Sequence, residues 1–540
     1  MVEQRLFGQG AAPGLARGVV CVLSAIPPVR HAALSPAEEH AALSTAITAA
    51  RAEAEAQAAQ AAGPAAAMLE FQAVMLADDE LARPAMAAVA AGASGASAWV
   101  AAMAAEIAGY AASGDAAFAA RAADLEDIRD RVLRRLAPVA PDTTPPGAVV
   151  AAPDLPLSRF MAIDWRHGGA IVLAGGSASS HVAMLARAQG VPMVVGVGAA
   201  VQALTGCEAL VDGTGGEIVL DPLEATRDAF SARIGRAADE RARAAGHRAG
   251  PAVTVDGTRV AVHVNIGALA ELDGLDPDDC DGIGLVRTEL LFHDGTGTGQ
   301  TGLPDENIQA AAYRRIAAWA GGRPAVIRTL DAGGDKPIPG VTPDGESNPF
   351  LGLRGLRLAL QAPAPLRMQL RALARAAVHG DLRVLLPMVT VPAELELARS
   401  LLDEAMADLA RDGIPARRPP LGIMVEVPAA AISVERFDAA FFSVGSNDLT
   451  QYVTAAGRGI ASVSGLADPL NPAVLRLIEG VARHGLARGR DVGLCGDAAA
   501  DPRCTGPLLR AGLRSLSVAP EALGRVKRAI AAVDLRSSAS

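Results

Sequence analysis

The stretch that decides the fold is residues 421–448, LGIMVEVPAAAISVERFDAAFFSVGSND. It contains two short apolar runs, 421–425 and 440–444, and each is followed closely by polar side chains. Glu426 comes directly after the first run, and Asp448 lies just beyond the second. Strands of a parallel sheet that are covered on both faces are apolar throughout. The pattern therefore predicts two buried parallel strands with reactive side chains at their carboxyl ends.

The same pattern repeats along the C-terminal half of the chain, where strand-like runs alternate with helical segments. The eight runs lie at 259–264, 282–286, 324–328, 382–386, 421–425, 440–444, 491–494 and 515–518. Eight β/α units in succession predict a (β/α)8 barrel. In such barrels the reactive side chains gather where strands end and the following loops begin.

Charged and polar side chains are concentrated at these predicted strand ends and in the loops after them. An arginine and a carboxylate at a barrel mouth can simply pair, so each residue alone has a structural explanation. Four arginines, a lysine and two separate carboxylates at one end together predict a ligand site. The candidates are Arg287, Arg328, Lys336, Arg354, Glu426, Asn447, Asp448, Arg458 and Cys495.

The chemistry of this set indicates a small, phosphorylated, carboxylate-bearing anion. Arginines bind phosphate and carboxylate groups with two parallel hydrogen bonds. Glu426 and Asp448 offer hard oxygen ligands, which suit Mg²⁺ when substrate oxygens complete its shell. Cys495 is the only soft, protonatable group, and it could equally be a small buried apolar side chain.

The N-terminal part has a different organisation. From about Ser35 to Leu136, alanine, glutamate and arginine dominate at helical spacing, which predicts an all-α domain. Strand-like runs with glycine turns flank it and predict one α/β domain that the helices interrupt. The predicted boundaries are 1–30 with 146–222 for the α/β domain, 31–145 for the helical domain, 223–250 for a helical linker and 251–540 for the barrel.

His181 is one of only nine histidines and lies in GGSASSHVAMLARAQGVP, residues 175–192. A helix is predicted to begin there, with Ser179 and Ser180 as candidate caps and phosphate donors. A helix N-terminus favours an anion and disfavours protonation of a nearby imidazole, which would stay nucleophilic. The sequence therefore predicts a phosphoryl group on His181. A histidine that merely caps a helix is the alternative.

The bulk properties exclude several classes of protein. The net charge is −10 and no basic stripe is present, which argues against nucleic-acid binding. No apolar run approaches the roughly 18 residues of a membrane span, and the first residues lack a signal pattern. Five scattered cysteines fit a reduced, cytoplasmic chain without disulfides.

Several motifs, in order along the chain, resemble enzyme I of the bacterial phosphoenolpyruvate-dependent sugar phosphotransferase system, a phosphoenolpyruvate–protein phosphotransferase. The motifs are SSHVAMLAR, GIGLVRTELLF, RTLDAGGDK, NPFLGLRG, GIMVEVP, SVGSNDLTQY and GLCGD. RAADLEDIRDRVL and EFQAVMLADDE also look like the helical domain of that family. The resemblance covers essentially the whole chain.

The resemblance implies a role for each candidate. His181 would accept the phosphoryl group on Nε2. In the barrel, the phosphoryl group would be bound by Arg287, Arg328, Lys336 and Arg354, and Arg458 would bind the anionic end of the substrate. Asn447 and the Asp448 backbone would contact the substrate carboxylate. Glu426 and Asp448 would hold Mg²⁺, and Cys495 would protonate the enol carbon.

The resemblance also implies partners and motion. The α/β domain would swivel, the helical domain would bind a histidine-containing phosphocarrier protein, and the barrel would form a homodimer. No side chain in this interpretation requires ATP.

The sequence departs from the family pattern at Ser177, Ser179, Gly457, Ile460, Asp497 and Ala500. These changes affect the loops around His181 and Arg458 and remove no core group. They leave open a regulatory paralogue that is phosphorylated, turns over weakly and serves a non-sugar carrier. A relative of pyruvate phosphate dikinase would need a nucleotide-binding domain, and the segment 35–136 is too short and lacks a glycine-rich phosphate loop.

Overall fold

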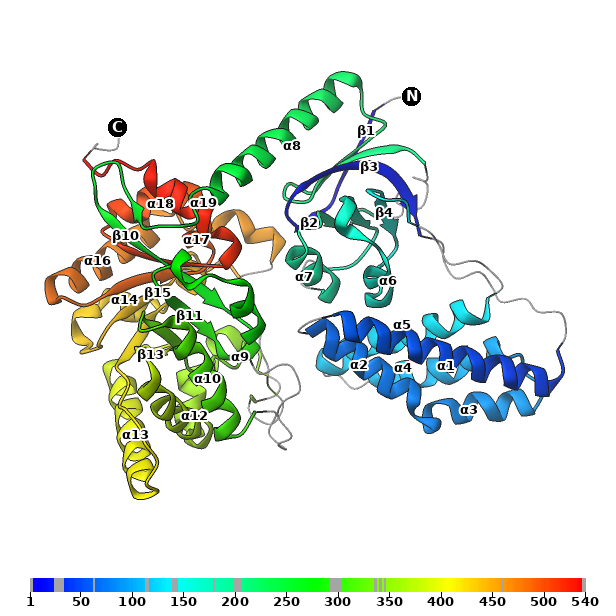
Figure 1. Cartoon of the computed structure of the whole chain (residues 1–540), viewed down its shortest axis with the longest axis horizontal. Coiled ribbons are helices and arrows are strands. Elements are labelled where there is room, and N and C mark those ends of the chain that lie inside the picture. The colour runs from blue at the N-terminus through cyan, green and yellow to red at the C-terminus, as the bar shows by residue number, and fades with distance from the viewer. Residues whose placement is uncertain are drawn as a thin grey trace. The chain divides into compact units, whose positions relative to one another are not determined.

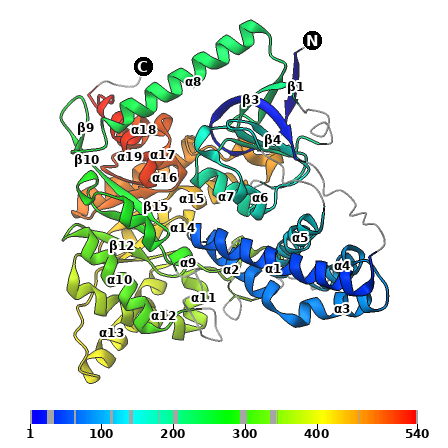
Figure 2. The same ribbon diagram turned by 45° about the vertical axis from the view of Figure 1, so that its right-hand side comes forward.

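The computed structural model describes residues 3–23, 34–61, 64–111, 116–137, 144–177, 180–198, 206–291, 303–334, 338, 342–343, 346–457 and 460–536. The chain divides into two compact units, Met1–Ala238 and Asp239–Ser540. The first is called the N-terminal unit and the second the barrel unit. Figures 1 and 2 show both, coloured along the chain.

The helical part of the N-terminal unit is drawn in blue shades in Figure 1. Its helices are α1 (Pro36–Gln60), α2 (Pro64–Ala77), α3 (Asp79–Ala90), α4 (Gly95–Ala111) and α5 (Ala116–Leu136). A capping box between Ser35 and Glu38 starts α1. Trp99 and Ile128 are fully buried in the core that these helices share. The predicted all-α insertion is confirmed.

The α/β part is built on one sheet with the strand order β1-β8-β7-β3-β4-β5-β6-β2. The strands are β1 (Gln4–Phe7), β2 (Gln9–Ala12), β3 (Leu15–Val22), β4 (Val149–Ala152), β5 (Ala170–Leu173), β6 (Met193–Val195), β7 (Glu208–Asp212) and β8 (Glu217–Leu220). Strand β3 pairs in parallel with β4, although the whole helical part separates them in sequence. The helical part is therefore inserted into an α/β domain, as predicted.

Two short helices accompany this sheet, α6 (Leu157–Ala162) and α7 (His181–Ala188). The longer α8 (Glu224–Ala245) follows β8 and has one buried residue, Phe230. Phe230 packs on Leu210 and Val219 of the sheet. This fits the prediction of a charged helix without a large apolar face.

The barrel unit closes on itself. Its parallel strands are β10 (Arg259–Ile266), β11 (Ile283–Arg287), β12 (Ala325–Arg328), β13 (Leu382–Leu386), β14 (Leu421–Val425), β15 (Phe442–Gly445), β16 (Val492–Cys495) and β17 (Ser515–Val518). Strand β10 pairs with both β11 and β17, so no edge is left open, and the short β9 (Ala252–Val253) adds to β10 in antiparallel. All eight predicted strands are present, and the (β/α)8 barrel is confirmed.

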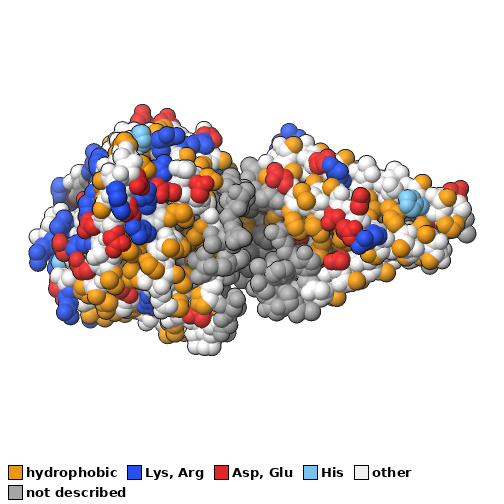
Figure 3. Space-filling model, turned by 90° about the horizontal axis from the view of Figure 1, so that it is seen from below, with side chains coloured by type: hydrophobic (Ala, Val, Ile, Leu, Met, Phe, Trp, Pro, Cys, Tyr) orange, Lys and Arg blue, Asp and Glu red, His pale blue; other side chains and the backbone are white. Residues whose placement is uncertain are grey.

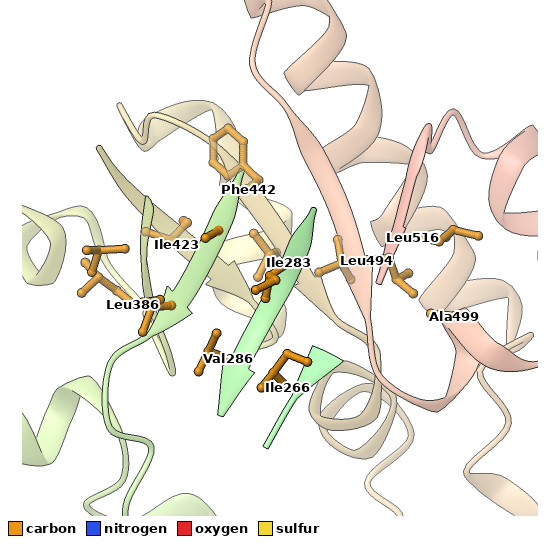
Figure 4. Packing of buried hydrophobic residues seen from close by; sticks show 14 of the residues in the cluster. Ile266, Ile283, Val286, Leu386, Ile423, Phe442, Leu494, Ala499 and Leu516 are labelled. Atoms are coloured by element: carbon orange, nitrogen blue, oxygen red, sulfur yellow. The ribbon is translucent and has the colours of Figure 1, made fainter. Parts of the chain in front are cut away.

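Alternate residues of these strands face two different cores. One core lies between the strands and the surrounding helices, and Figure 4 shows Ile283, Ile423 and Leu494 within it. A smaller cluster fills the barrel from several strands and includes Leu285, Met424 and Cys495. A period of two along each strand produces this division.

The helices that surround the barrel include α10 (Glu306–Ala320), α12 (Pro363–Ala376), α13 (Pro392–Arg411), α16 (Pro472–Arg488) and α19 (Leu523–Ala531). In the described parts of both units, no helix combines the length and apolar character that a membrane span needs. On the face shown in Figure 3, basic and acidic side chains are interspersed rather than separated.

Candidate active site

Arg354 lies between β12 and the helix α11 (Leu356–Gln361) and is fully buried. Its Nε and one terminal nitrogen donate to Asp331 at 3.1 and 3.0 Å. Both terminal nitrogens donate to Asp448, at 3.2 and 2.9 Å, and one also reaches the Tyr452 hydroxyl at 3.4 Å. A guanidinium has five N–H groups, and these five contacts use all of them. Arg354 therefore fixes one carboxylate in the loop after β12 and another in the helix that follows β15.

Arg328, the last residue of β12, lies beside this group and is also buried. It forms ion pairs of 3.1 Å with Glu289, in α9 (Thr288–Leu291), and with Asp331. Burial alone would lower the pKa of Arg328, but these carboxylates hold it well above its usual value. Its Nε has no hydrogen-bond partner among the described residues. A buried cation with a free donor is suited to an anionic ligand.

Glu426 follows β14 and is almost completely buried. Its Oε1 accepts a hydrogen bond of 2.6 Å from the Met388 backbone N–H. Met388 has a φ of +57°, a conformation that costs energy in a residue with a side chain. Burial, with Asp448 and Asp331 nearby, raises the pKa of Glu426 to about 8, although Arg328 opposes the shift. The site thus disfavours the charged form of Glu426.

The donor set fits a divalent cation held by two carboxylates. Glu426 and Asp448 come from the ends of neighbouring strands, and both present hard oxygen atoms. Burial, followed by the charges of Asp448 and Asp331, raises the pKa of Glu426, and a bound cation would favour its charged form. Within the described ranges, no group of three or more candidate metal-ligating side chains occurs. Substrate oxygens and water would therefore have to complete the shell.

Cys495 ends β16 and is buried inside the barrel. Its Sγ lies 3.9 Å from the Ser443 hydroxyl and 3.6 Å from the Val444 carbonyl oxygen. Burial raises the pKa of the Cys495 thiol, with Arg328 acting against the shift and Glu426 adding to it. The thiol therefore holds its proton at neutral pH, as an acid must.

Asn447 opens the helix α15 (Ser446–Thr454) together with Asp448. Its amide exchanges two hydrogen bonds with Asp497, one to the side chain at 3.2 Å and one from the backbone N–H at 2.9 Å. Asn447 is thus fixed between the loops after β15 and β16.

The remaining predicted barrel residues are placed differently. Arg287 ends β11 and is exposed. Lys336 and Arg458 lie outside the described residues, as does Ser179 in the N-terminal unit. Their predicted roles stay predictions.

His181 is the first residue of α7, as the sequence predicted. Ser180 is the N-cap, and its side chain accepts from the Ala183 backbone N–H at 3.2 Å. At the other end Gly190 adopts a φ of +68°, and the Val191 N–H donates to the Ala186 carbonyl at 2.8 Å. This Schellman motif explains why the helix stops after two turns.

Sequence reasoning missed some residues that shape the site. Tyr452 donates to the Phe350 carbonyl at 2.6 Å and accepts from Arg354. The arginine also lies 6.0 Å from the centre of the Phe350 ring. Tyr452 follows Asp448 by one helical turn, so its spacing was a usable signal. The backbone donor of Met388 left no trace in the sequence.

Comparisons with known proteins match most of the chain. The family description "PEP-utilising enzyme, N-terminal" matches residues 7–121, "PEP-utilising enzyme, mobile domain" matches 144–216 and "PEP-utilising enzyme, PEP-binding domain" matches 241–535. A "Phosphoenolpyruvate-protein phosphotransferase" of Haloferax volcanii is 42% identical over 400 residues, covering 72% of this chain and 68% of that protein.

A second relative, of the same name and from Enterococcus faecalis, is 35% identical over 392 residues and covers 72% of this chain and 67% of that protein. A solved structure described as "N-terminal domain of Enzyme 1 - Nitrogen" is 26% identical, with a TM-score of 0.34 over 43% of this chain and 99% of that one.

Proposed function

The chain belongs to the phosphoenolpyruvate-utilising enzymes as a phosphoenolpyruvate–protein phosphotransferase, and we propose that His181 carries the phosphoryl group in its reaction. The P–O bond to the enol oxygen of phosphoenolpyruvate breaks, and a P–N bond to His181 Nε2 forms. The enolate that leaves takes a proton at its methylene carbon and becomes pyruvate. The phosphoryl group then passes from His181 to a histidine of a phosphocarrier protein.

The observation that carries this proposal is the arrangement of buried charge at the barrel mouth. Arg328 and Arg354 lie among four acidic side chains, Glu289, Asp331, Glu426 and Asp448. Phosphoryl transfer depends on positioning and charge stabilisation more than on covalent help from the protein. Charged side chains that are held in place and shielded from water supply that stabilisation without reorganising during the reaction.

Each side chain has a proposed task. Arg328 donates its free Nε–H to the phosphoryl oxygens, with Arg287 and Lys336 beside it, and Arg458 binds the anionic end of the substrate. Arg354 holds Asp331 and Asp448 in place and joins the phosphoryl cluster when the substrate binds. Asn447 and the Asp448 backbone contact the carboxylate, and Cys495 donates the proton to the enolate carbon.

Glu426 and Asp448 are the residues that would hold Mg²⁺. When bound there, the ion neutralises charge on the phosphoryl and enol oxygens. The protein's part is to keep the two carboxylates at fixed positions, through Met388 for Glu426 and through Arg354 for Asp448.

The parts of the chain are proposed to divide the work along the predicted boundaries. Residues 1–30 with 146–222 carry the phosphohistidine, 31–145 bind the histidine-containing phosphocarrier protein, 223–250 link the units, and 251–540 bind phosphoenolpyruvate and form a homodimer. The chain acts in the cytoplasm, where it catalyses the first step of a sugar phosphotransferase system. The relatives do not favour the alternative of a weakly active regulatory paralogue.

A single-turnover measurement tests this proposal. The wild-type chain, mixed with phosphoenolpyruvate and Mg²⁺ and without nucleotide, is expected to release one pyruvate per chain in a rapid burst. His181→Ala should give no burst, whereas His247→Ala, at an exposed position after α8, should match the wild type. A burst of equal size from His181→Ala would contradict the proposal.

A further inference from the structure

The loop after β16 fits closely against the start of α15. The Ser446 hydroxyl donates to the Cys495 carbonyl at 2.8 Å, and Ser446 is almost completely buried. The next residue of the loop, Gly496, has a φ of +98°, and a Cβ atom there would overlap the Ser446 Oγ and lie 2.7 Å from the Asn447 Oδ1. Glycine is the residue that permits so close an approach. The loop and the helix are therefore held together at the residue that follows Cys495.

The Asn447 amide is held in one orientation by Asp497. The Asp497 backbone N–H, which can only donate, lies 2.9 Å from the Asn447 Oδ1. The Asn447 Nδ2 donates to the Asp497 Oδ2 at 3.2 Å, and an ionised carboxylate can only accept. Turning the amide over would place N–H against N–H and oxygen against oxygen. Both contacts with Asp497 thus require the same orientation of the amide.

This orientation leaves one donor of the Asn447 amide for a ligand. The second N–H of Nδ2 has no acceptor among the described residues. It belongs to the first turn of α15, whose N-cap, Gly445, offers no side-chain hydrogen bond. The backbone N–H groups of such a turn favour a negatively charged ligand. The fixed amide therefore adds a side-chain donor to a helix start that is suited to an anion.

The charge of Asp497 acts in the opposite sense. The Asp497 side chain is exposed, and its carboxylate lies 3.2 Å from the amide that would contact the substrate carboxylate. Two negative charges repel, so an aspartate without any other task here would weaken the binding of an anion. Orientation of Asn447 and repulsion of the ligand thus predict opposite effects when Asp497 is removed.

We propose that Asp497 is a positioning residue that orients the Asn447 amide as a hydrogen-bond donor to the carboxylate of phosphoenolpyruvate. This inference rests on the proposed function, in which Asn447 contacts that carboxylate. In phosphoenolpyruvate the carboxylate carbon and the methylene carbon are both bonded to the enol carbon. A carboxylate that is fixed by Asn447 therefore also places the methylene carbon that Cys495 protonates.

The test measures the burst of pyruvate that the full chain releases with Mg²⁺ at increasing concentrations of phosphoenolpyruvate. The measurement gives the limiting burst rate and the concentration at which half of that rate is reached. In Asp497→Ala the half-saturating concentration is expected to rise about three- to tenfold, because the amide loses one of the two contacts that orient it. The limiting rate should fall by a smaller factor, since the groups that touch the phosphoryl group are unchanged.

Asp497→Asn separates the oxygen acceptor from the charge. Its side-chain oxygen can still accept from Asn447, so the half-saturating concentration should stay within about twofold of the wild-type value. An aspartate that only repels the ligand predicts that both variants lower the half-saturating concentration, because both remove a negative charge. An unchanged or lower half-saturating concentration in Asp497→Ala would overturn the proposal.

Asp491→Ala is the matched control at the other end of β16. Asp491 directly precedes the strand, and its side chain is 77% exposed and pairs with Arg383 at 2.8 Å. The variant removes the same charge from the chain without touching α15, and its half-saturating concentration should equal that of the wild type. A rise as large as that in Asp497→Ala would assign the effect to net charge and overturn the proposal.

A double-mutant cycle shows whether Asp497 acts through Asn447. Asn447→Ala should raise the half-saturating concentration, and adding Asp497→Ala should raise it no further, because the amide that Asp497 orients is already absent. Fully additive effects would contradict the proposal. Wild-type binding by Asn447→Ala would overturn the contact on which the inference depends, whereas a wild-type chain that releases no pyruvate would overturn the proposed function itself.

Discussion

Arg354 donates to both carboxylate oxygens of Asp448, at 2.9 and 3.2 Å, across 94 residues of sequence. The pair joins the loop after β12 to the helix that follows β15, and both side chains are buried. Asp331 occupies the other edge of the same guanidinium. A proposed metal ligand is thus oriented by a cation that is itself held by a second carboxylate.

Replacing Arg354 with methionine is expected to destabilise the barrel unit by about 3–5 kcal/mol, because two buried carboxylates lose their common partner. Urea unfolding followed by the fluorescence of Trp319 measures this, in a background where Trp99 and Trp165 are replaced by phenylalanine. Pyruvate formation should be lost as well.

Arg418→Met is the control for that experiment. Arg418 pairs with Asp403 at 2.8 Å on the surface, with 46% and 63% of the two side chains exposed. An exposed pair contributes at most about 1 kcal/mol. An equal loss of unfolding free energy in the two variants would mean that Arg354 does not support the site.

Cys495→Ser is expected to slow proton transfer to carbon. Exchange of the pyruvate methyl hydrogens with deuterated water, followed by proton NMR, should fall about 10²- to 10⁴-fold if the thiol is the acid. Cys504→Ser, a buried change on α18 (Pro502–Arg510), should leave the exchange rate unchanged. A normal rate in Cys495→Ser would identify Cys495 as a small buried side chain and nothing more.

Glu426→Gln keeps the shape of the side chain and removes a proposed metal ligand. The Mg²⁺ concentration for half-maximal pyruvate formation should rise by at least about tenfold, and a chelator should abolish the wild-type reaction. Glu435→Gln, a nearby exposed carboxylate, is the matched control. An unchanged Mg²⁺ requirement in Glu426→Gln would remove Glu426 from the metal site.

His263, on β10, makes the stability of the barrel depend on pH. Burial lowers the pKa of His263, with Asp281 and Asp491 opposing the shift and Arg383 adding to it. In the unfolded chain the His263 imidazole therefore takes up a proton near pH 6.5, whereas in the folded chain it stays neutral at that pH. The contribution of His263 to the free energy of unfolding is fully present above that pH. It declines as the pH falls, by at most about 1.4 kcal/mol per pH unit.

Urea unfolding of the barrel between pH 8 and pH 5.5 measures this effect. His263→Asn should flatten the profile, whereas His247→Gln, at an exposed position, should not. The His263 ring lies 3.2 Å from the Ser515 hydroxyl, a contact that asparagine can partly replace. A profile for His263→Asn as steep as that of the wild type would assign the pH dependence to other groups.

The barrel was predictable from sequence because its strands are buried on both faces. Six of the eight strands begin at the predicted residue or one residue later and end within one residue of the prediction, as at 421–425 and 382–386. Strand β15 begins two residues later than predicted, at Phe442, where its register with β14 begins. Apolar runs indicate where strands lie, and the pairing between strands decides where they begin.

The sequence placed Arg328 and Glu426 at the ends of predicted strands, and they lie at the ends of β12 and β14. That both are buried was not predicted. Arg354 donates all its hydrogen bonds to Asp331, Asp448 and Tyr452. These contacts could not be predicted from the sequence, because they depend on segments that meet only after the barrel closes. The same holds for the bond from the Met388 backbone to Glu426.

His181 is the residue proposed to carry the phosphoryl group of phosphoenolpyruvate. The most direct measurement incubates the chain with phosphoenolpyruvate labelled on phosphorus and Mg²⁺, digests it at alkaline pH, and locates the label by mass spectrometry. We expect one acid-labile, base-stable phosphoryl group, on His181 within residues 175–192. An unlabelled chain, or a label on any other residue, would contradict it.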